Sequence, residues 1–190
     1  MLNRCGWAGS EPIYTDYHDI EWGVPEWDSR ALWEKLILDG FQAGLSWITI
    51  LKKRNNFRAA FVNFDPVKIA MWDDVDIEHL LKNEGIIRHR GKIQATISNA
   101  QAYLKIDDFS KLCWSYVDGK PLQANHTTSA EVPVYTDMST RFSKDLKNMG
   151  FKYCGPTIVY AWMQACGLIN DHLTTCPQHE LCRSLGSPPR

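Results

Sequence analysis

Residues 38–47 read Leu-Asp-Gly-Phe-Gln-Ala-Gly-Leu-Ser-Trp, and this stretch decides how the chain folds. It lies between two runs of apolar residues with helical periodicity, Ser29–Leu38 and Ile48–Phe57. Gly40 and Gly44 lie between the two runs, and glycine permits close backbone approach and dihedral angles that other residues avoid. The stretch therefore predicts a tight junction between two helices.

A carboxylate and a large aromatic ring flank this predicted junction. Asp39 comes just before the break and Trp47 just after it. Together they supply what is needed to hold a planar ligand that donates hydrogen bonds or carries positive charge. An ordinary helix corner with Trp47 in the core would give the same spacing, so the pattern alone leaves both readings open.

The remainder of the chain predicts an all-α fold. Residues 1–28 are rich in aromatics and poor in periodicity, with one short helix around Thr15–Glu21, and residues 121–138 are polar and irregular. The other predicted helices are Arg30–Leu38 capped by Asp28 or Ser29, Pro66–Met71, a helix that Asp73 or Asp74 caps, a long helix after Gly91, Phe109–Val117, Thr140–Met149 capped by Ser139, and a buried helix Pro156–Gly167. No strand of clear length is visible.

Size and composition indicate a single domain spanning residues 1–190. The chain has 44% hydrophobic residues and eight tryptophans, enough to bury a sizeable core. No apolar run reaches membrane-spanning length and the N-terminus lacks a signal-peptide pattern, so a cytoplasmic protein is expected. In that compartment the six cysteines are expected as thiols or metal ligands rather than disulfides.

Basic residues are concentrated in two segments without any Asp or Glu. Residues 40–64 carry four Lys or Arg, and residues 85–106 carry four more, although the chain has a net charge of −1. Such asymmetry indicates a basic face suited to a polyanion such as nucleic acid. Two solvated helix faces would produce the same runs of charge.

Cysteine and histidine residues at opposite ends of the chain suggest a metal site. Cys5 and His18 lie in the irregular N-terminal arm, and His172 and Cys176 are four positions apart, a spacing that aligns side chains on one helical turn. Two thiolates with two imidazoles make a closed tetrahedral Zn²⁺ site, which would be structural. Cys166, Cys176, His179 and Cys182 offer rival spacings, whereas Cys113, Cys154 and Cys166 are read as buried small side chains.

A helical hairpin is predicted over residues 74–106. Gly85–Gly91 separates two helical runs, and the second run could present its N-terminus to a phosphate. Arg88, Arg90 and Lys92 would add charge that binds DNA without sequence preference. The turn lacks the usual spacing of two hairpin glycines, so an ordinary helical corner remains the alternative.

Several long motifs identify the chain with a known family. They are residues 17–19 (Tyr-His-Asp), 21–25 (Glu-Trp-Gly-Val-Pro), 42–47 (Gln-Ala-Gly-Leu-Ser-Trp), 85–90 (Gly-Ile-Ile-Arg-His-Arg) and 164–168 (Gln-Ala-Cys-Gly-Leu). Through them the chain closely resembles, essentially from end to end, the 3-methyladenine DNA glycosylase I family of the helix-hairpin-helix DNA glycosylase superfamily. The resemblance implies a two-lobed helical fold with the pocket for the damaged base between the lobes.

The resemblance also implies which residues form the sites. It implies one structural zinc held by Cys5, His18, His172 and Cys176, a base pocket of Tyr14, Tyr17, Trp22 and Trp47, and a catalytic-site carboxylate that reads the edge of the base. Best-known members carry Glu at the place of Asp39, so hydrogen-bond reach shortens here by roughly one ångström. This difference is expected to affect the affinity for the damaged base more than the selectivity between bases.

The activity implied by the resemblance is hydrolysis of the N-glycosidic bond of 3-methyladenine, with 3-methylguanine as a further substrate to test. The enzyme would act as a monomer on double-stranded DNA and flip the damaged nucleotide out of the duplex. Gly44 and Leu45 would approach the gap that this nucleotide leaves in the base stack. No catalytic lysine is implied, so the DNA strand would stay uncut. Asp107 and Asp108 are read as exposed caps, with a catalytic role as the alternative. A zinc-stabilised protein that binds alkylated DNA without cleaving it is the second hypothesis.

Overall fold

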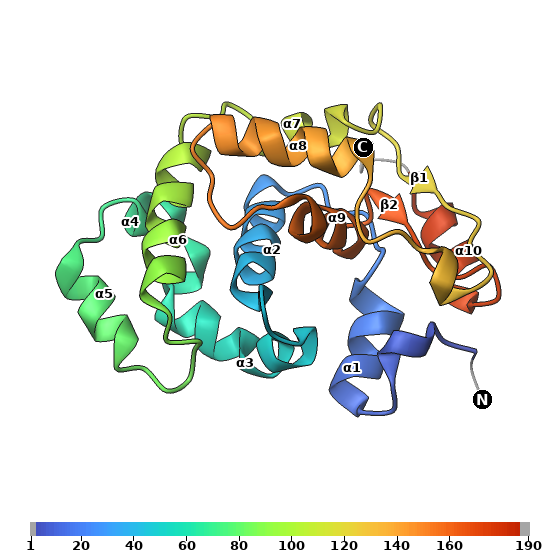
Figure 1. The fold of residues 1–190 in the computed structure, drawn as a ribbon, viewed down its shortest axis with the longest axis horizontal. Helices are drawn as coiled ribbons and strands as arrows, with labels where there is room; N and C mark the ends of the chain where they lie inside the picture. The colour runs from blue at the N-terminus through green and yellow to red at the C-terminus, as the bar shows by residue number, and fades with distance from the viewer. Residues whose placement is uncertain (1–2, 187–190) are drawn as a thin grey trace.

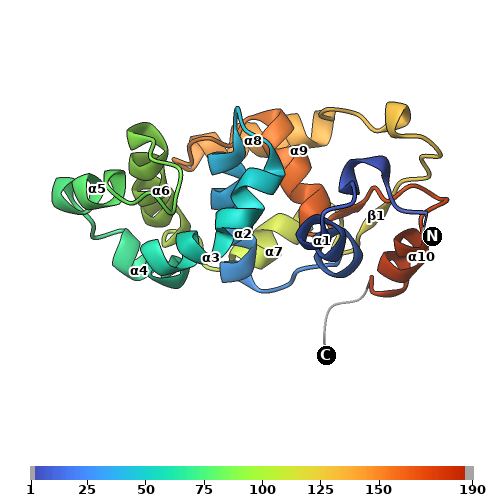
Figure 2. The same cartoon turned by 90° about the horizontal axis from the view of Figure 1, so that it is seen from below.

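The computed structural model describes residues 3–186, which form an elongated and mostly helical molecule (Figure 1). In chain order the longer elements are α1 (Pro12–Asp16), α2 (Ser29–Gln42), α3 (Trp47–Ala60), α4 (Pro66–Ile69), α5 (Asp74–Leu81), α6 (Arg90–Tyr103), α7 (Phe109–Ser115), β1 (Leu122–Gln123), α8 (Asp137–Asn148), α9 (Pro156–Ala165), β2 (Ile169–Asn170) and α10 (Pro177–Ser184). Short helical segments are η1 (Gly6–Ala8), η2 (Tyr17–Glu21), η3 (Val62–Phe64) and η4 (Ser129–Glu131). Both views place α4, α5 and α6 at one end and α1 and α10 at the other (Figures 1 and 2). In this part of the chain, no helix combines the length and the apolar character needed to cross a membrane.

The central helix of the core is α9, as its apolar composition predicts. It packs against both α2 and α8. Trp162 is fully buried, and its indole N–H donates a hydrogen bond to the carbonyl of Leu32 at 2.9 Å. That bond satisfies the polar end of a large buried ring and joins α9 to α2. The predicted buried helix is confirmed within two residues of its end.

The first long helix, α2, extends further than the two glycines predict. Asp28 caps it by accepting a hydrogen bond from the Ala31 amide at 2.8 Å, and the helix continues through Gly40 to Gln42. The predicted break at Gly40 is therefore wrong. Gly40 is buried inside the helix, and a Cβ atom there would lie 3.4 Å from Tyr153. The chain turns instead at residues 43–46, where Gly44 has a φ of +81°.

Side-chain caps fix the starts of several other helices. Asp73 caps α5 within a capping box, and Asp108 caps α7 by accepting from the Lys111 amide at 2.9 Å. For α8 the predicted cap Ser139 is wrong, because Thr136 is the N-cap and Ser139 occupies the third helical position of a capping box. The predicted helix starts three residues late because Ser139 is the second residue of the capping box and not the N-cap.

The segment between α7 and α8 is largely irregular, as its composition predicts, but it contains one strand. β1 pairs in parallel with β2, with Leu122 opposite Ile169. This two-residue pairing was not predicted, because a strand this short carries no periodicity. It holds the chain that precedes η4 against the segment that follows α9.

A second cluster of buried apolar residues lies apart from the main core. Tyr17, Trp22, Leu51 and Ala165 form it, and Trp7, Tyr14 and Trp47 pack against it while half-buried. These residues come from the N-terminal arm, α3 and the end of α9. The cluster therefore anchors an arm that has too few apolar residues to form a core of its own.

Candidate active site

A cavity of about 610 Å³ opens between the N-terminal arm, α2, α3 and α9. Its lining includes every residue singled out for base binding, namely Tyr14, Tyr17, Trp22, Asp39 and Trp47. These side chains come from the N-terminal arm, α2 and α3, and the fold brings them to one place. The volume is in the range of small-molecule sites.

Aromatic rings form the apolar wall of this cavity. Tyr17 and Trp47 have ring centroids 5.5 Å apart, and Trp7 lies 4.9 Å from Trp22 and 5.2 Å from Tyr14. Trp7, which the sequence did not single out for base binding, also lines the cavity. The spacing of a single tryptophan does not distinguish a cavity position from a core position.

Asp39 is a buried carboxyl group that lines the same cavity as the aromatic rings. It lies in the last turn of α2 and only 4% of its surface is exposed, while its Oδ2 has no hydrogen-bond partner among the described residues. Burial raises the pKa of Asp39 to about 8, although the charge of Lys35 opposes the shift. The group is consequently protonated at neutral pH until a donor or a cation enters the cavity.

The cavity is also lined by polar residues to which the sequence assigned no role. They are Gln42 from α2, Tyr160 and Gln164 from α9, and Asp171 after β2. Gln42 and Gln164 fall within the family motifs, and Tyr160 and Asp171 lie outside them. No local pattern shows that residues 42 and 171 meet in space.

The segment η2 is a π-helix, and its backbone places two neighbouring side chains on different sites. Tyr17 lines the cavity, whereas His18 belongs to a neighbouring cluster of cysteine and histidine residues. A bidentate ion pair between Glu21 and Arg54, with one N–O distance of 2.7 Å, joins η2 to α3. Such single-turn π segments are frequent at functional sites.

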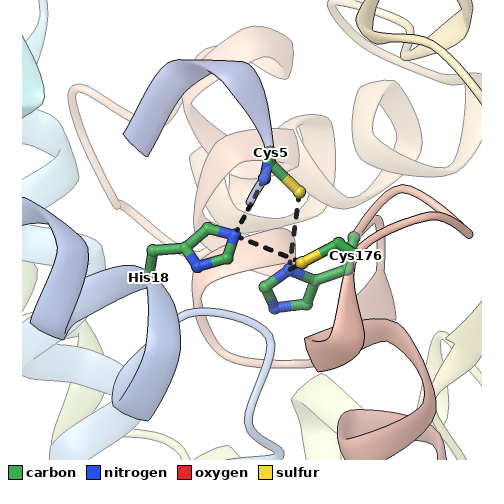
Figure 3. A group of neighbouring side chains, drawn as sticks. Cys5, His18 and Cys176 are labelled. Atoms are coloured by element: carbon green, nitrogen blue, oxygen red, sulfur yellow. Dashed lines mark hydrogen bonds between the residues drawn. The ribbon is translucent and has the colours of Figure 1, made fainter. Parts of the chain in front are cut away.

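Four buried side chains form a cluster that adjoins the cavity through Cys5: Cys5, His18, His172 and Cys176. Figure 3 labels Cys5, His18 and Cys176 of this cluster. Their candidate ligand atoms all lie within 4.8 Å of one another. Cys176 Sγ lies 3.7 Å from His18 Nε2 and 3.8 Å from His172 Nδ1, and Cys5 Sγ lies 3.6 Å from His172 Nδ1. The predicted helical turn between residues 172 and 176 is wrong, because a non-helical loop spans them and Cys176 is the N-cap of α10.

The outer nitrogens of both histidines are already paired. His18 Nδ1 lies 2.8 Å from the carboxylate of Asp19, which Arg4 also binds, and His172 Nε2 donates to the carbonyl of Trp22 at 2.9 Å. These contacts leave His18 Nε2 and His172 Nδ1 directed at the two thiols. Burial lowers the pKa of His172 to about 4, so its imidazole is neutral and able to bind a metal.

The rival cysteine and histidine spacings do not assemble into a site in the described residues. His179 donates from Nε2 to the carbonyl of Ala124 at 2.8 Å. Cys113, Cys154, Cys166 and Cys182 are buried thiols outside the cluster, in agreement with the small-hydrophobe reading for the first three.

The residues expected to contact DNA divide into two groups. Gly44 and Leu45 are exposed at the turn between α2 and α3. Arg88 and Arg90 are exposed near the start of α6, and each is paired with an acidic residue, Glu84 and Glu78 respectively. All four are accessible to a large ligand.

Lys92 differs from this expectation. It is 7% exposed, and its ammonium donates to the carbonyls of Phe41 at 2.8 Å and Ala43 at 2.6 Å. These are carbonyls at the C-terminal end of α2, where a cation is favourable. Lys92 therefore stabilises the turn before Gly44, and it is not part of an exposed basic face.

The two acidic residues downstream of the hairpin lie away from the cavity. Asp107 and Asp108 are exposed, and neither lines the cavity. Asp108 accepts hydrogen bonds from the Lys111 amide and from the Ser29 hydroxyl. A helix cap accounts for its contacts.

Comparison with known proteins identifies related sequences and structures. The model of the methyladenine glycosylase family matches residues 7–179. DNA-3-methyladenine glycosylase 1 of Escherichia coli is 53% identical, over 92% of this chain and 96% of its own length, and DNA-3-methyladenine glycosylase of Haemophilus influenzae is 49% identical over 93% and 98%. A crystal structure of a 3-methyladenine DNA glycosylase I in complex with 3-methyladenine superimposes with a TM-score of 0.91 at 41% identity, over 94% of this chain and 98% of that one.

Proposed function

The chain belongs to the methyladenine glycosylase family, and on that premise we propose that it hydrolyses the N-glycosidic bond of 3-methyladenine in alkylated DNA. The observation that carries the proposal is the cavity in which Asp39 meets Tyr17, Trp22 and Trp47. The two relatives from Escherichia coli and Haemophilus influenzae, which are 53% and 49% identical in sequence, are named as DNA-3-methyladenine glycosylases. A relative of the same fold has been crystallised with 3-methyladenine bound.

The chemistry demands little acid or base catalysis. Methylation at N3 makes the nucleobase cationic, so the bond between C1′ and N9 breaks with both electrons going to a base that leaves neutral. Water adds to C1′ and loses a proton, which completes the hydrolysis. Because the bond is weak from the start, selective binding of the damaged base and modest stabilisation of the sugar cation suffice.

The pocket suits a flipped-out methylated purine. The nucleotide must leave the duplex to be reached, and damage lowers the energy of unstacking. The rings of Tyr14, Tyr17, Trp22 and Trp47 would stack on the flat cation, while Asp39 would accept a hydrogen bond from its exocyclic amine. A positive ligand also lowers the pKa of Asp39, so the carboxylate ionises as the cation enters. No lysine lines the cavity within residues 3–186, which supports base release without strand cleavage.

We infer that the exposed turn and the hairpin bind the duplex around the flipped nucleotide. Leu45 would enter the gap in the base stack, with Gly44 allowing close backbone approach. The pair of helices α5 and α6 would act as the helix-hairpin-helix, with Arg88 and Arg90 exchanging their acidic partners for phosphates. The partner is double-stranded DNA, on which we expect a monomer to act in the cytoplasm.

The cysteine–histidine cluster would hold one structural Zn²⁺ per chain. For Zn–S of about 2.3 Å and Zn–N of about 2.05 Å, a tetrahedron places sulfur and nitrogen about 3.6 Å apart. The sulfur–nitrogen distances of 3.6, 3.7 and 3.8 Å fit that value. With all four positions taken by protein, the ion would anchor the N-terminal arm to the loop before α10.

The decisive experiment is base release from DNA treated with a methylating agent, with the products resolved by chromatography. We expect free 3-methyladenine and intact strands, and an Asp39→Ala variant slower by at least roughly tenfold, the scale of one charged hydrogen bond. Retained binding to methylated DNA with no base released would contradict the proposal and favour the non-catalytic binder. The same products show whether 3-methylguanine is also a substrate.

A further inference from the structure

The face of α9 that lines the cavity carries an ordered polar network. Thr157, Tyr160, Ala161 and Gln164 line the cavity at helical spacing. The Tyr160 hydroxyl and the Gln164 side-chain amide both donate to Oδ2 of Asp171, the latter at 2.7 Å. Asp171 itself is only 2% exposed.

This network decides which side chains of the α9 face can donate hydrogen bonds and which can only accept them. A carboxylate only accepts hydrogen bonds, so Tyr160 donates its single hydroxyl proton to Asp171, and Gln164 turns its side-chain nitrogen toward the same oxygen. With its nitrogen turned to Asp171, Gln164 presents its carbonyl oxygen, and not an N–H donor, on its other side. Gln42 is oriented in the same sense, because its side-chain nitrogen donates to the Leu45 carbonyl at 2.9 Å. Both glutamines thus present their oxygens as acceptors.

The network adjoins the aromatic part of the cavity. Ala165, the neighbour of Gln164, packs in one cluster with Tyr17 and Trp22. His172, the neighbour of Asp171, lies edge-on to Trp22 with ring centroids 4.5 Å apart. A planar ligand held by the aromatic rings would therefore lie beside this wall.

We propose that Asp171 is a positioning residue, which holds Tyr160 and Gln164 as hydrogen-bond acceptors so that the cavity selects a 3-methylated purine with an exocyclic amine over its 6-oxo counterpart. The inference rests on the proposed function and adds a determinant of base choice to it. An amine has two hydrogens, one for Asp39 and one for this wall. A 6-oxo base would bring an oxygen against fixed oxygens and leave them unpaired, which a site built for hydrogen bonds rejects strongly.

The test compares two free bases, 3-methyladenine and 3-methylhypoxanthine, binding to the metal-loaded protein, followed by tryptophan fluorescence. We expect wild type to prefer the amine by at least roughly tenfold, as an unpaired buried polar group requires. In Gln164→Met and Asp171→Asn that preference should fall below the wild-type value while the part due to Asp39 remains, since the first variant removes an acceptor and the second lets Gln164 and Tyr160 turn round. Because Asp171 precedes a candidate metal ligand, zinc content and Tm are measured for each variant, and Gln164→Met gives a test remote from the cluster.

Tyr116→Phe is the matched control. Tyr116 donates to a carboxylate oxygen of Asp145 at 2.6 Å in the same kind of pair, but it does not line the cavity. Its loss should leave the preference between the two bases unchanged, whereas Tyr160→Phe should reduce it. Equal weakening of both bases in Gln164→Met and Asp171→Asn would mean that the network only supports the fold, and would overturn the inference while leaving the proposed function in place. Failure of wild type to bind either base would overturn both.

Discussion

Replacing Asp39 by Asn should change how the stability of the protein depends on pH. Asp39 is buried within α2, and burial raises its pKa from the usual 3.8 to about 8. Asn has nearly the same shape and no ionisation in this range. The comparison therefore isolates one proton, with every other titrating group common to both proteins.

The sign and size follow from linkage. In the unfolded chain Asp39 loses its proton near pH 4, but in the folded protein it keeps the proton up to about pH 8. Between these values the folded state holds the extra proton, so the free energy of unfolding falls as pH rises, by up to about 1.4 kcal/mol per pH unit. From pH 5 to pH 7 that is at most about 3 kcal/mol, and we expect at least about 1 kcal/mol.

Urea denaturation at pH 5, 6, 7 and 8 measures the effect directly. The stability of Asp39→Asn relative to wild type should increase over this range and level off above pH 8, where wild-type Asp39 ionises when folded. A difference between the two proteins that is the same at pH 5 and at pH 8 would refute the reasoning. It would mean that Asp39 ionises normally in the folded protein and that the cavity solvates it fully.

Three further predictions concern the metal cluster, the basic surface and the buried lysine. Cys176→Ser should lose the single bound zinc and lower Tm, and metal analysis that still finds one zinc per chain would contradict the assigned ligands. The double variant Arg88→Ala and Arg90→Ala should reduce the slope of log affinity for DNA against log salt by about two, with Lys144→Ala on α8 as control. Lys92→Met should cost about 1–3 kcal/mol in urea denaturation, since it leaves buried carbonyls unpaired, whereas Lys105→Met at an exposed position should change stability by less than about 0.5 kcal/mol.

Sequence patterns located the helices well because helical periodicity and caps are local properties. They failed for residues whose role depends on a contact with a residue far away in the sequence. Gly40 reads as a helix break, yet it is buried inside α2 beside Tyr153, which is more than a hundred positions away. Lys92 reads as a surface charge, but its ammonium is directed to the end of α2. The role of such a residue depends on which helix packs beside it, and that information is not in the local sequence.

The candidate site shows the same limit. Asp39 and Trp47 stand out because they flank one turn, whereas Asp171 and Gln164 come to the cavity only through the packing of α9 and the β1–β2 pairing. The resemblance to the family pointed to Tyr14, Tyr17, Trp22 and the four metal-site residues, which the fold does gather in two groups. Composition and periodicity alone would not have separated those residues from ordinary core aromatics and thiols.

The π-helix η2 explains why the two groups adjoin each other. Because Tyr17 and His18 are consecutive, any shift of this segment moves the cavity wall and the metal cluster together. Trp22 strengthens the link, since its ring lines the cavity while its carbonyl accepts the hydrogen bond of His172. The N-terminal arm has only a small apolar cluster to hold it, so a metal bound at the four side chains would also fix the position of the rings. A metal at this position would hold the arm without further core packing, and it would leave the rings that line the cavity able to face a ligand.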